Sequence, residues 1–108
     1  MIIKNLNQLK KVLRPGVEFE VVLHSRPECV GQIRRVTKVN TTGFYTTIPS
    51  EPDNKANAGN GGVGLYCDWG PARYWTFDAE GVCAKYSNYK YTPNEIIMAF
   101  KITREGTE

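Results

Sequence analysis

The side chains best suited to chemistry in this sequence are one histidine and three cysteines. His24, Cys29, Cys67 and Cys83 supply the four ligands of a Cys₃His zinc site, in which three thiolates and one imidazole form a tetrahedral shell. No two of these cysteines have the close spacing of a zinc knuckle. Two interpretations therefore stay open: a structural zinc, or inert cysteines that act as small buried hydrophobic side chains.

No other residues match a known catalytic arrangement. Asp68 and Asp78 have no second histidine to orient, and Cys29 is the only cysteine near His24 in sequence. Residues 59–64 fit the pattern G-x-G-x-x-G, but a dinucleotide fingerprint follows a strand and opens a helix. Here the glycines follow a polar loop and precede an expected strand. We interpret them as a flexible connector and expect a protein that is not an enzyme.

Aromatic and basic side chains give a stronger indication of function. Residues 85–91 mix tyrosine with serine, asparagine and lysine, which is the composition of a protein-binding surface. We expect the partner-binding residues to be Tyr66, Tyr74, Tyr86, Tyr89 and Tyr91, with Arg26, Arg34 and Arg35. Two alternatives remain: these rings only cap the core, or they stack nucleic-acid bases while the arginines contact phosphates.

A short helix near the N-terminus must support these residues. Asn5 is a suitable N-cap, Leu6, Leu9 and Leu13 follow helical spacing, and Pro15 ends the pattern. The sequence therefore predicts a helix over about residues 5–14.

The rest of the chain has the period-two pattern of strands. Val17, Phe19, Val21 and Leu23 alternate with more polar residues, so we expect them to share one face. The next strand, over 30–39, breaks its alternation at residues 34–35, where we expect a β-bulge. Residues 49–62 form a long polar loop, and residues 96–102 form a strand after a short turn.

These elements predict an α+β domain that is mainly antiparallel β. The N-terminal helix packs on a twisted sheet or small barrel of about six to seven short strands. We expect one compact domain over residues 1–103 and a flexible tail over 104–108. The absence of a long apolar run or a secretion signal predicts a cytoplasmic protein with no membrane partner.

The whole chain resembles, in size and general character, the small accessory proteins of phages and mobile elements. These include the anti-CRISPR proteins, which inhibit RNA-guided nucleases. The resemblance implies a host protein, such as a CRISPR nuclease, as a partner that is bound without chemistry. A net charge of +3 favours binding to a protein surface over imitation of DNA. The alternative is a small-barrel module that binds nucleic acid through its basic and aromatic residues.

Overall fold

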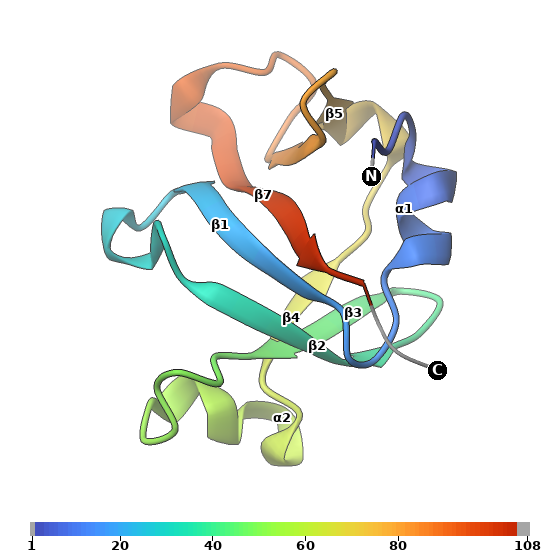
Figure 1. Cartoon of the computed structure of the whole chain (residues 1–108). Helices are drawn as coiled ribbons and strands as arrows, with labels where there is room; N and C mark the ends of the chain where they lie inside the picture. The colour runs from blue at the N-terminus through green and yellow to red at the C-terminus, as the bar shows by residue number, and fades with distance from the viewer. Residues whose placement is uncertain (1, 106–108) are drawn as a thin grey trace.

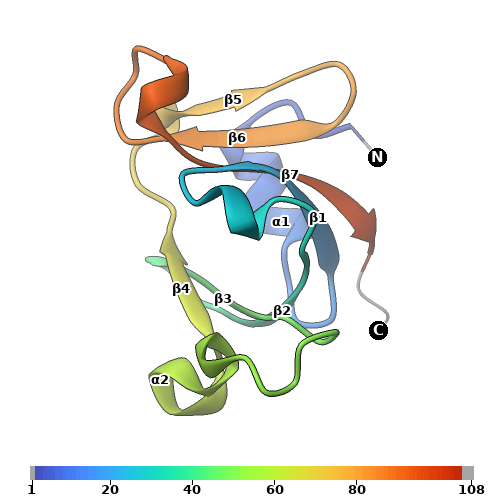
Figure 2. The same cartoon turned by 90° about the vertical axis from the view of Figure 1, so that its left-hand side faces the viewer.

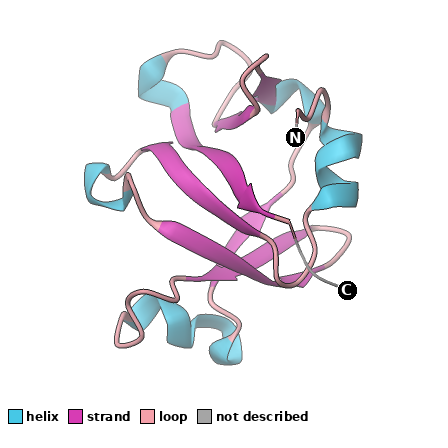
Figure 3. Ribbon diagram, in the orientation of Figure 1, coloured by secondary structure: helices cyan, strands magenta, loops and turns pink. Residues whose placement is uncertain are grey.

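The computed structural model describes residues 2–105 and contains one seven-stranded antiparallel sheet with an N-terminal helix (Figures 1 and 3). The expected α+β class is therefore confirmed. The helix α1 spans Leu6–Val12, and the strands are β1 (Glu18–His24), β2 (Ile33–Val39), β3 (Gly43–Thr47), β4 (Leu65–Asp68), β5 (Trp75–Phe77), β6 (Val82–Tyr86) and β7 (Ile96–Arg104). The short helix α2 (Gly59–Gly62) and four 3₁₀ turns, η1 (Pro27–Cys29), η2 (Lys55–Ala58), η3 (Ala72–Tyr74) and η4 (Pro93–Glu95), lie between them.

Helix α1 begins where the sequence predicts. The Asn5 side chain accepts a hydrogen bond of 2.8 Å from the backbone N–H of Gln8, and Gln8 accepts one of 2.7 Å from the Lys4 N–H. The face that carries Leu6 and Leu9 is buried against the sheet. Nowhere in residues 2–105 is a helix both long and apolar enough to cross a membrane.

The sheet consists of two meanders that meet at its centre. Its strand order is β4-β3-β2-β1-β7-β6-β5, so the pairing of β1 with β7 joins the first four strands to the last three. The sheet curls strongly, and helix α1 lies behind it in the view of Figure 2. This curvature brings the two ends of the sheet toward one another, although β4 and β5 do not pair.

Side chains bridge the seam between the two ends of the sheet. The indole N–H of Trp75 donates a hydrogen bond of 2.7 Å to the backbone carbonyl of Trp69. The Lys85 ammonium lies 2.7 Å from Oδ1 of Asp68 and also donates to the backbone carbonyl of Asp68. The result is an open barrel that is held together by side chains along one seam.

The inner face of the curled sheet carries an aromatic core. The rings of Phe19 and Phe100 lie 4.2 Å apart between centroids, and Phe44 lies 5.0 Å from Trp69. These residues and Leu9 of α1 are buried, so the helix and both halves of the sheet share one core. Aromatic side chains of this size dominate the apolar area that such a small domain can bury.

The β-bulge expected at residues 34–35 is wrong. Arg34 pairs regularly with Phe19, and it is Arg34, not Ile33, that points inward with Val36. A register shift lies instead between Val36 and Lys38, and β1 has one between Glu18 and Phe19 and another between Val21 and Leu23. The shift between Val21 and Leu23 turns Leu23 outward, where it is 55% exposed, so it does not share the face of the preceding apolar residues.

The C-terminal segment follows the expected turn-then-strand pattern, with η4 leading into β7. Strand β7 extends to Arg104, the first residue of the expected tail, which pairs with Glu18. Residues 106–108 of that tail lie outside the described part of the chain.

The polar segment over 49–62 contains local structure that the sequence pattern did not predict. Besides η2 and α2, the Asn57 side chain accepts a hydrogen bond of 2.6 Å from the Ile48 N–H and donates one of 2.8 Å to the Glu51 carbonyl. At Gly64 the flexible-connector interpretation is wrong. A Cβ there would lie 1.9 Å from the carbonyl oxygen of Thr46, so two backbones approach too closely for any side chain.

Two glycines of this segment provide a matched test of that close approach. Gly61 (φ +76°) and Gly64 (φ +98°) both have left-handed backbones, but a Cβ at Gly61 would meet nothing within 4 Å. We expect Gly61→Ala to cost about 1–2 kcal/mol of unfolding free energy from backbone strain alone. Gly64→Ala should cost at least about 2 kcal/mol more, because of the clash. Equal midpoints in urea denaturation would contradict the packing role of Gly64.

Candidate functional site

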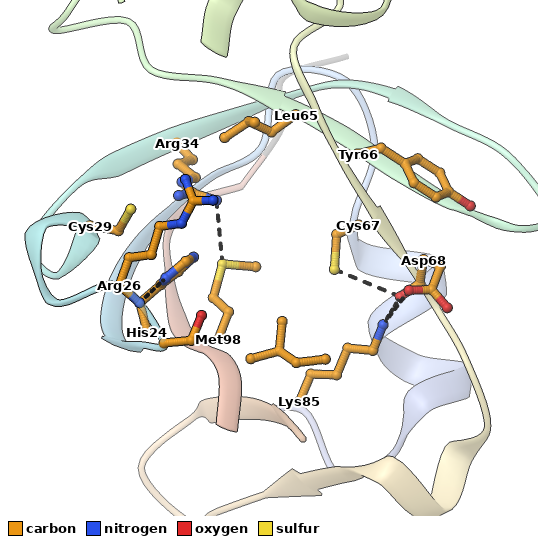
Figure 4. A pocket seen from close by; sticks show the side chains of 12 residues that line it. His24, Arg26, Cys29, Arg34, Leu65, Tyr66, Cys67, Asp68, Lys85 and Met98 are labelled. Atoms are coloured by element: carbon orange, nitrogen blue, oxygen red, sulfur yellow. Dashed lines mark hydrogen bonds and ion pairs between the residues drawn. The ribbon is translucent and has the colours of Figure 1, made fainter. Parts of the chain in front are cut away.

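A pocket of about 350 Å³ lies beside the seam of the open barrel (Figure 4). Strand β1, η1 and β2 form one side, β4 forms the other, and β6 and β7 contribute the rest. The lining residues that carry polar or sulfur groups are His24, Ser25, Arg26, Cys29, Arg34, Tyr66, Cys67, Asp68, Lys85 and Met98, and the apolar ones are Leu65 and Ile97.

The pocket belongs to the same inner face as the aromatic core. Arg34 pairs with Phe19, Cys67 with Phe44, and Lys85 with both Trp75 and Met98, so strand alternation turns all of these side chains inward. The inner face is apolar where it contacts helix α1 and polar at the pocket.

Arg34 is a buried charge whose close neighbours are neutral. The residue is 5% exposed. Its Nη2 donates to the Gln32 side-chain oxygen at 3.1 Å, and its Nη1 lies 3.6 Å from the sulfur of Met98. Burial lowers the pKa of Arg34, and the nearby Cys29 thiol opposes that shift. Within residues 2–105, the structure shows no carboxylate in an ion pair with Arg34.

The net charge of the pocket is positive. Lys85 is 3% exposed and is paired with Asp68, whose side chain is 62% exposed at the rim. Arg26, Arg34 and Lys85 supply three positive charges against the one negative charge of Asp68, which leaves +2 with His24 neutral. This balance favours an anionic group inside the pocket.

His24 is held as a neutral imidazole. Its Nδ1 accepts a hydrogen bond of 2.9 Å from the Arg26 backbone N–H, so the ring proton of the neutral form sits on Nε2. Burial lowers the pKa of His24, and the positive charges of Arg34 and Arg26 lower it further, while Glu28 opposes them. The lowered pKa and the hydrogen bond that Nδ1 accepts both favour the neutral ring.

The four expected zinc ligands do not converge. His24, Cys29 and Cys67 line the pocket, but Cys83 lies in the core with its thiol 3.9 Å from the Gly81 carbonyl. No group of three or more potential metal ligands occurs within the described residues. Burial raises the pKa of Cys67 to about 11 and that of Cys83 to about 12. The arrangement of the described residues lends the zinc prediction no support, and it stays a prediction.

The expected tyrosines fall into two groups. Tyr66 borders the pocket at the edge of the sheet, while its ring packs on the outer face, 4.9 Å from that of Tyr45 between centroids. The second group lies in a segment that we call the tyrosine loop, residues 86–91, in which the rings of Tyr86 and Tyr91 are 5.2 Å apart and Tyr89 is 60% exposed. Tyr74 lies in η3, and Trp69 and Trp75 are buried.

The expected arginines also separate. Arg26 and Arg34 line the pocket, whereas Arg35 lies on the opposite face of β2. Both Nε and Nη2 of Arg35 contact Glu18, at 2.9 Å and 2.8 Å, so its charge is already neutralised.

Sequence reasoning missed Lys85 and Met98 as members of the site. The sequence gives no signal for Lys85, because Val82, Ala84 and Tyr86 alternate with it and form the more apolar face of residues 82–86. Met98 gives no signal either, because methionine is an ordinary core residue.

Comparison with protein-family models, with curated protein sequences and with solved structures gives no match. The pocket, with its geometry and charges, and the tyrosine loop are therefore the features from which a function is inferred.

The lowered pKa of His24 predicts a loss of stability in mild acid. The unfolded chain binds a proton near the ordinary pKa of 6.5 but the folded chain binds it at lower pH, so the unfolding free energy falls as pH drops below about 6.5. His24→Gln should remove that part of the pH dependence, and because the chain has one histidine the comparison is direct. Urea denaturation at several pH values between 7.5 and 5.5 measures it. Parallel pH profiles for the two proteins would contradict the prediction.

Proposed function

We propose that this chain is a non-enzymatic binding protein that attaches to a partner protein through the tyrosine loop. The observation that carries this proposal is the backbone of Tyr91, which has φ +54° although its side chain is 42% exposed. A left-handed backbone costs about 1–2 kcal/mol for a residue with a Cβ. Strain in an exposed aromatic residue is typical of a site that acts on another molecule.

The tyrosine loop is ordered before any partner arrives. The Tyr91 hydroxyl donates a hydrogen bond of 2.6 Å to the Arg73 carbonyl, and the Tyr91 ring packs against Tyr86. The Ser87 N–H donates to the Glu95 carbonyl at 2.6 Å, and the Lys90 N–H to the Asn88 side chain at 2.8 Å. Because these contacts already restrict the loop, a partner gains aromatic contact area at a small further loss of entropy.

The site chemistry supports binding without catalysis. Burial raises the pKa values of Cys67 and Cys83, which keeps both thiols protonated and weakly nucleophilic near neutral pH. The only histidine uses Nδ1 to accept a backbone hydrogen bond. The partner in this proposal is a host defence protein of the cytoplasm, such as an RNA-guided nuclease that a phage or mobile element would inhibit. The resemblance in size and character to anti-CRISPR proteins supports that choice.

One observation favours a nucleic-acid-binding module as a second candidate. The outer face of β2, β3 and β4 carries Lys38, Tyr45 and Tyr66 in a row, with the Lys38 ammonium 5.8 Å from the Tyr45 ring centroid. A cation beside two neighbouring rings is an arrangement on which bases can stack. The small net charge of +3 weighs against strong contacts to a phosphate backbone.

The test is capture of partners from a bacterial lysate with the wild type and with Tyr91→Gly, followed by affinity measurements on the captured protein. Glycine relieves the left-handed strain but loses the ring contact and one hydrogen bond, so stability should change by less than about 1 kcal/mol. We expect affinity to fall at least tenfold, while the control Tyr45→Ser on the other tyrosine group leaves it unchanged.

The same capture experiment distinguishes the two candidates by salt dependence. Binding through the tyrosine loop should vary little between low and moderate salt. The nucleic-acid module would replace the proposal if the protein captures nucleic acid and that binding falls steeply with salt. In that case Tyr45→Ser should abolish the binding and Tyr91→Gly should leave it intact. Unchanged protein binding by Tyr91→Gly would also overturn it.

A further inference from the structure

The pocket beside the seam has the features of a ligand site that is separate from the tyrosine loop. One of its polar groups, the Arg34 guanidinium, is buried and is contacted by the Gln32 amide oxygen, the Met98 thioether and the Cys29 thiol, none of them a carboxylate. A buried charge without a counterion is costly, and replacement by an apolar side chain of similar size is often neutral or stabilising. An arginine in this position therefore needs a reason beyond stability.

We propose that this pocket binds a small organic oxyanion, a carboxylate or a phosphate monoester, and that Arg34 is the residue that pairs with the charged group. The oxyanion replaces the Met98 sulfur as the acceptor for Nη1 of Arg34. A thioether is a weak acceptor, and the distance of 3.6 Å from Nη1 to the sulfur is long for a hydrogen bond. A charged oxygen accepts from a guanidinium much more strongly, and in a fixed planar geometry.

Neighbouring charges strengthen the preference for an anion. Arg26 lies at the same side of the pocket as Arg34, and Figure 4 shows Lys85 on another wall, with its ammonium directed toward Asp68. Since Asp68 compensates Lys85, the charge left without compensation belongs to Arg34 and Arg26. Neutral His24 adds a ring N–H that can donate to the same anion.

The remaining walls define the body of the ligand. Leu65, Ile97 and Met98 line the pocket with apolar groups, so the molecule carries a compact apolar or aromatic part beside its charged group. A volume of about 350 Å³ is at the small end of the range for small-molecule sites. The pocket therefore suits a small molecule with one anionic group, and not a polymer that carries a charge on every monomer.

The experiment is a titration of the whole protein followed by NMR signals of the Met98 methyl group and the His24 ring. The probes are benzoate, phenyl phosphate and the neutral analogue benzamide. We expect saturable shifts with one or both anions at millimolar concentration and at least tenfold weaker binding of benzamide. The anion that binds more tightly identifies the charged group as carboxylate or phosphate.

Two neighbouring arginines give a matched pair of variants for the same titration. Arg34→Met should bind the preferred anion at least tenfold more weakly while folding at least as stably as the wild type. Arg35→Gln removes a positive charge from the opposite face of the same strand and should leave the affinity unchanged.

The titration of the wild-type protein tests the proposed anion binding even if Arg34→Met does not fold. Equal binding of benzamide and the anions, no saturable shift with either anion, or shifts confined to residues outside the pocket would each overturn the proposal. So would full affinity in folded Arg34→Met. Loss of anion binding without any change in capture through Tyr91 would show that the pocket and the tyrosine loop act separately.

Discussion

The contact between Lys85 and Asp68 joins two strands that are not neighbours in the sheet. Strands β4 and β6 lie near opposite ends of the strand order, yet the Lys85 ammonium and the Asp68 carboxylate are 2.7 Å apart. A few residues along the chain, the Trp75 indole N–H donates to the Trp69 carbonyl. These two contacts hold the sheet in a curl, and the curl gives the domain an interior. The aromatic core, the position of α1 and the pocket all depend on that closure.

The interior combines two kinds of chemistry on one continuous face. Phe19, Phe44 and Phe100 fill the part that contacts α1, while Arg34 and Lys85 occupy equivalent inward positions at the pocket. The apolar part supplies the driving force for folding, because buried aromatic area dominates the stability of a domain this small. The polar part carries two buried cations, of which only Lys85 has a carboxylate partner. This difference between the two cations is the physical basis for a ligand site at Arg34.

Local patterns predicted the elements of the fold but not its curvature. Asn5 and its leucines predicted the helix, and strict alternation from Val17 predicted β1, because capping and periodicity act over a few residues. Arg34 was expected on a partner-binding surface, since arginine is seldom buried. Its inward position follows from pairing with Phe19 and from a seam that residues far apart in sequence create. Cys83 likewise completed a Cys₃His ligand set by residue type alone, but its strand carries it into the core.

The sequence also did not reveal the special backbone conformations at Gly64 and Tyr91. Gly64 looked like one glycine in a flexible run, and only the approach of the Thr46 carbonyl explains why no side chain fits there. Tyr91 gave no sign of its left-handed backbone, because a tyrosine in a polar loop is ordinary. The composition of the tyrosine loop was nevertheless informative, since a mixture of tyrosine, serine and asparagine reflects surface chemistry and not topology.

Side chains close the seam between β4 and the β5–β6 hairpin, and hydrogen exchange of the Trp75 indole N–H probes that closure, because this proton is hydrogen-bonded across the seam. We expect its exchange to be as slow as that of the backbone amides of Phe19 and Phe100 in the core. Exchange at the rate of a free indole, while those amides stay protected, would show that the seam is open.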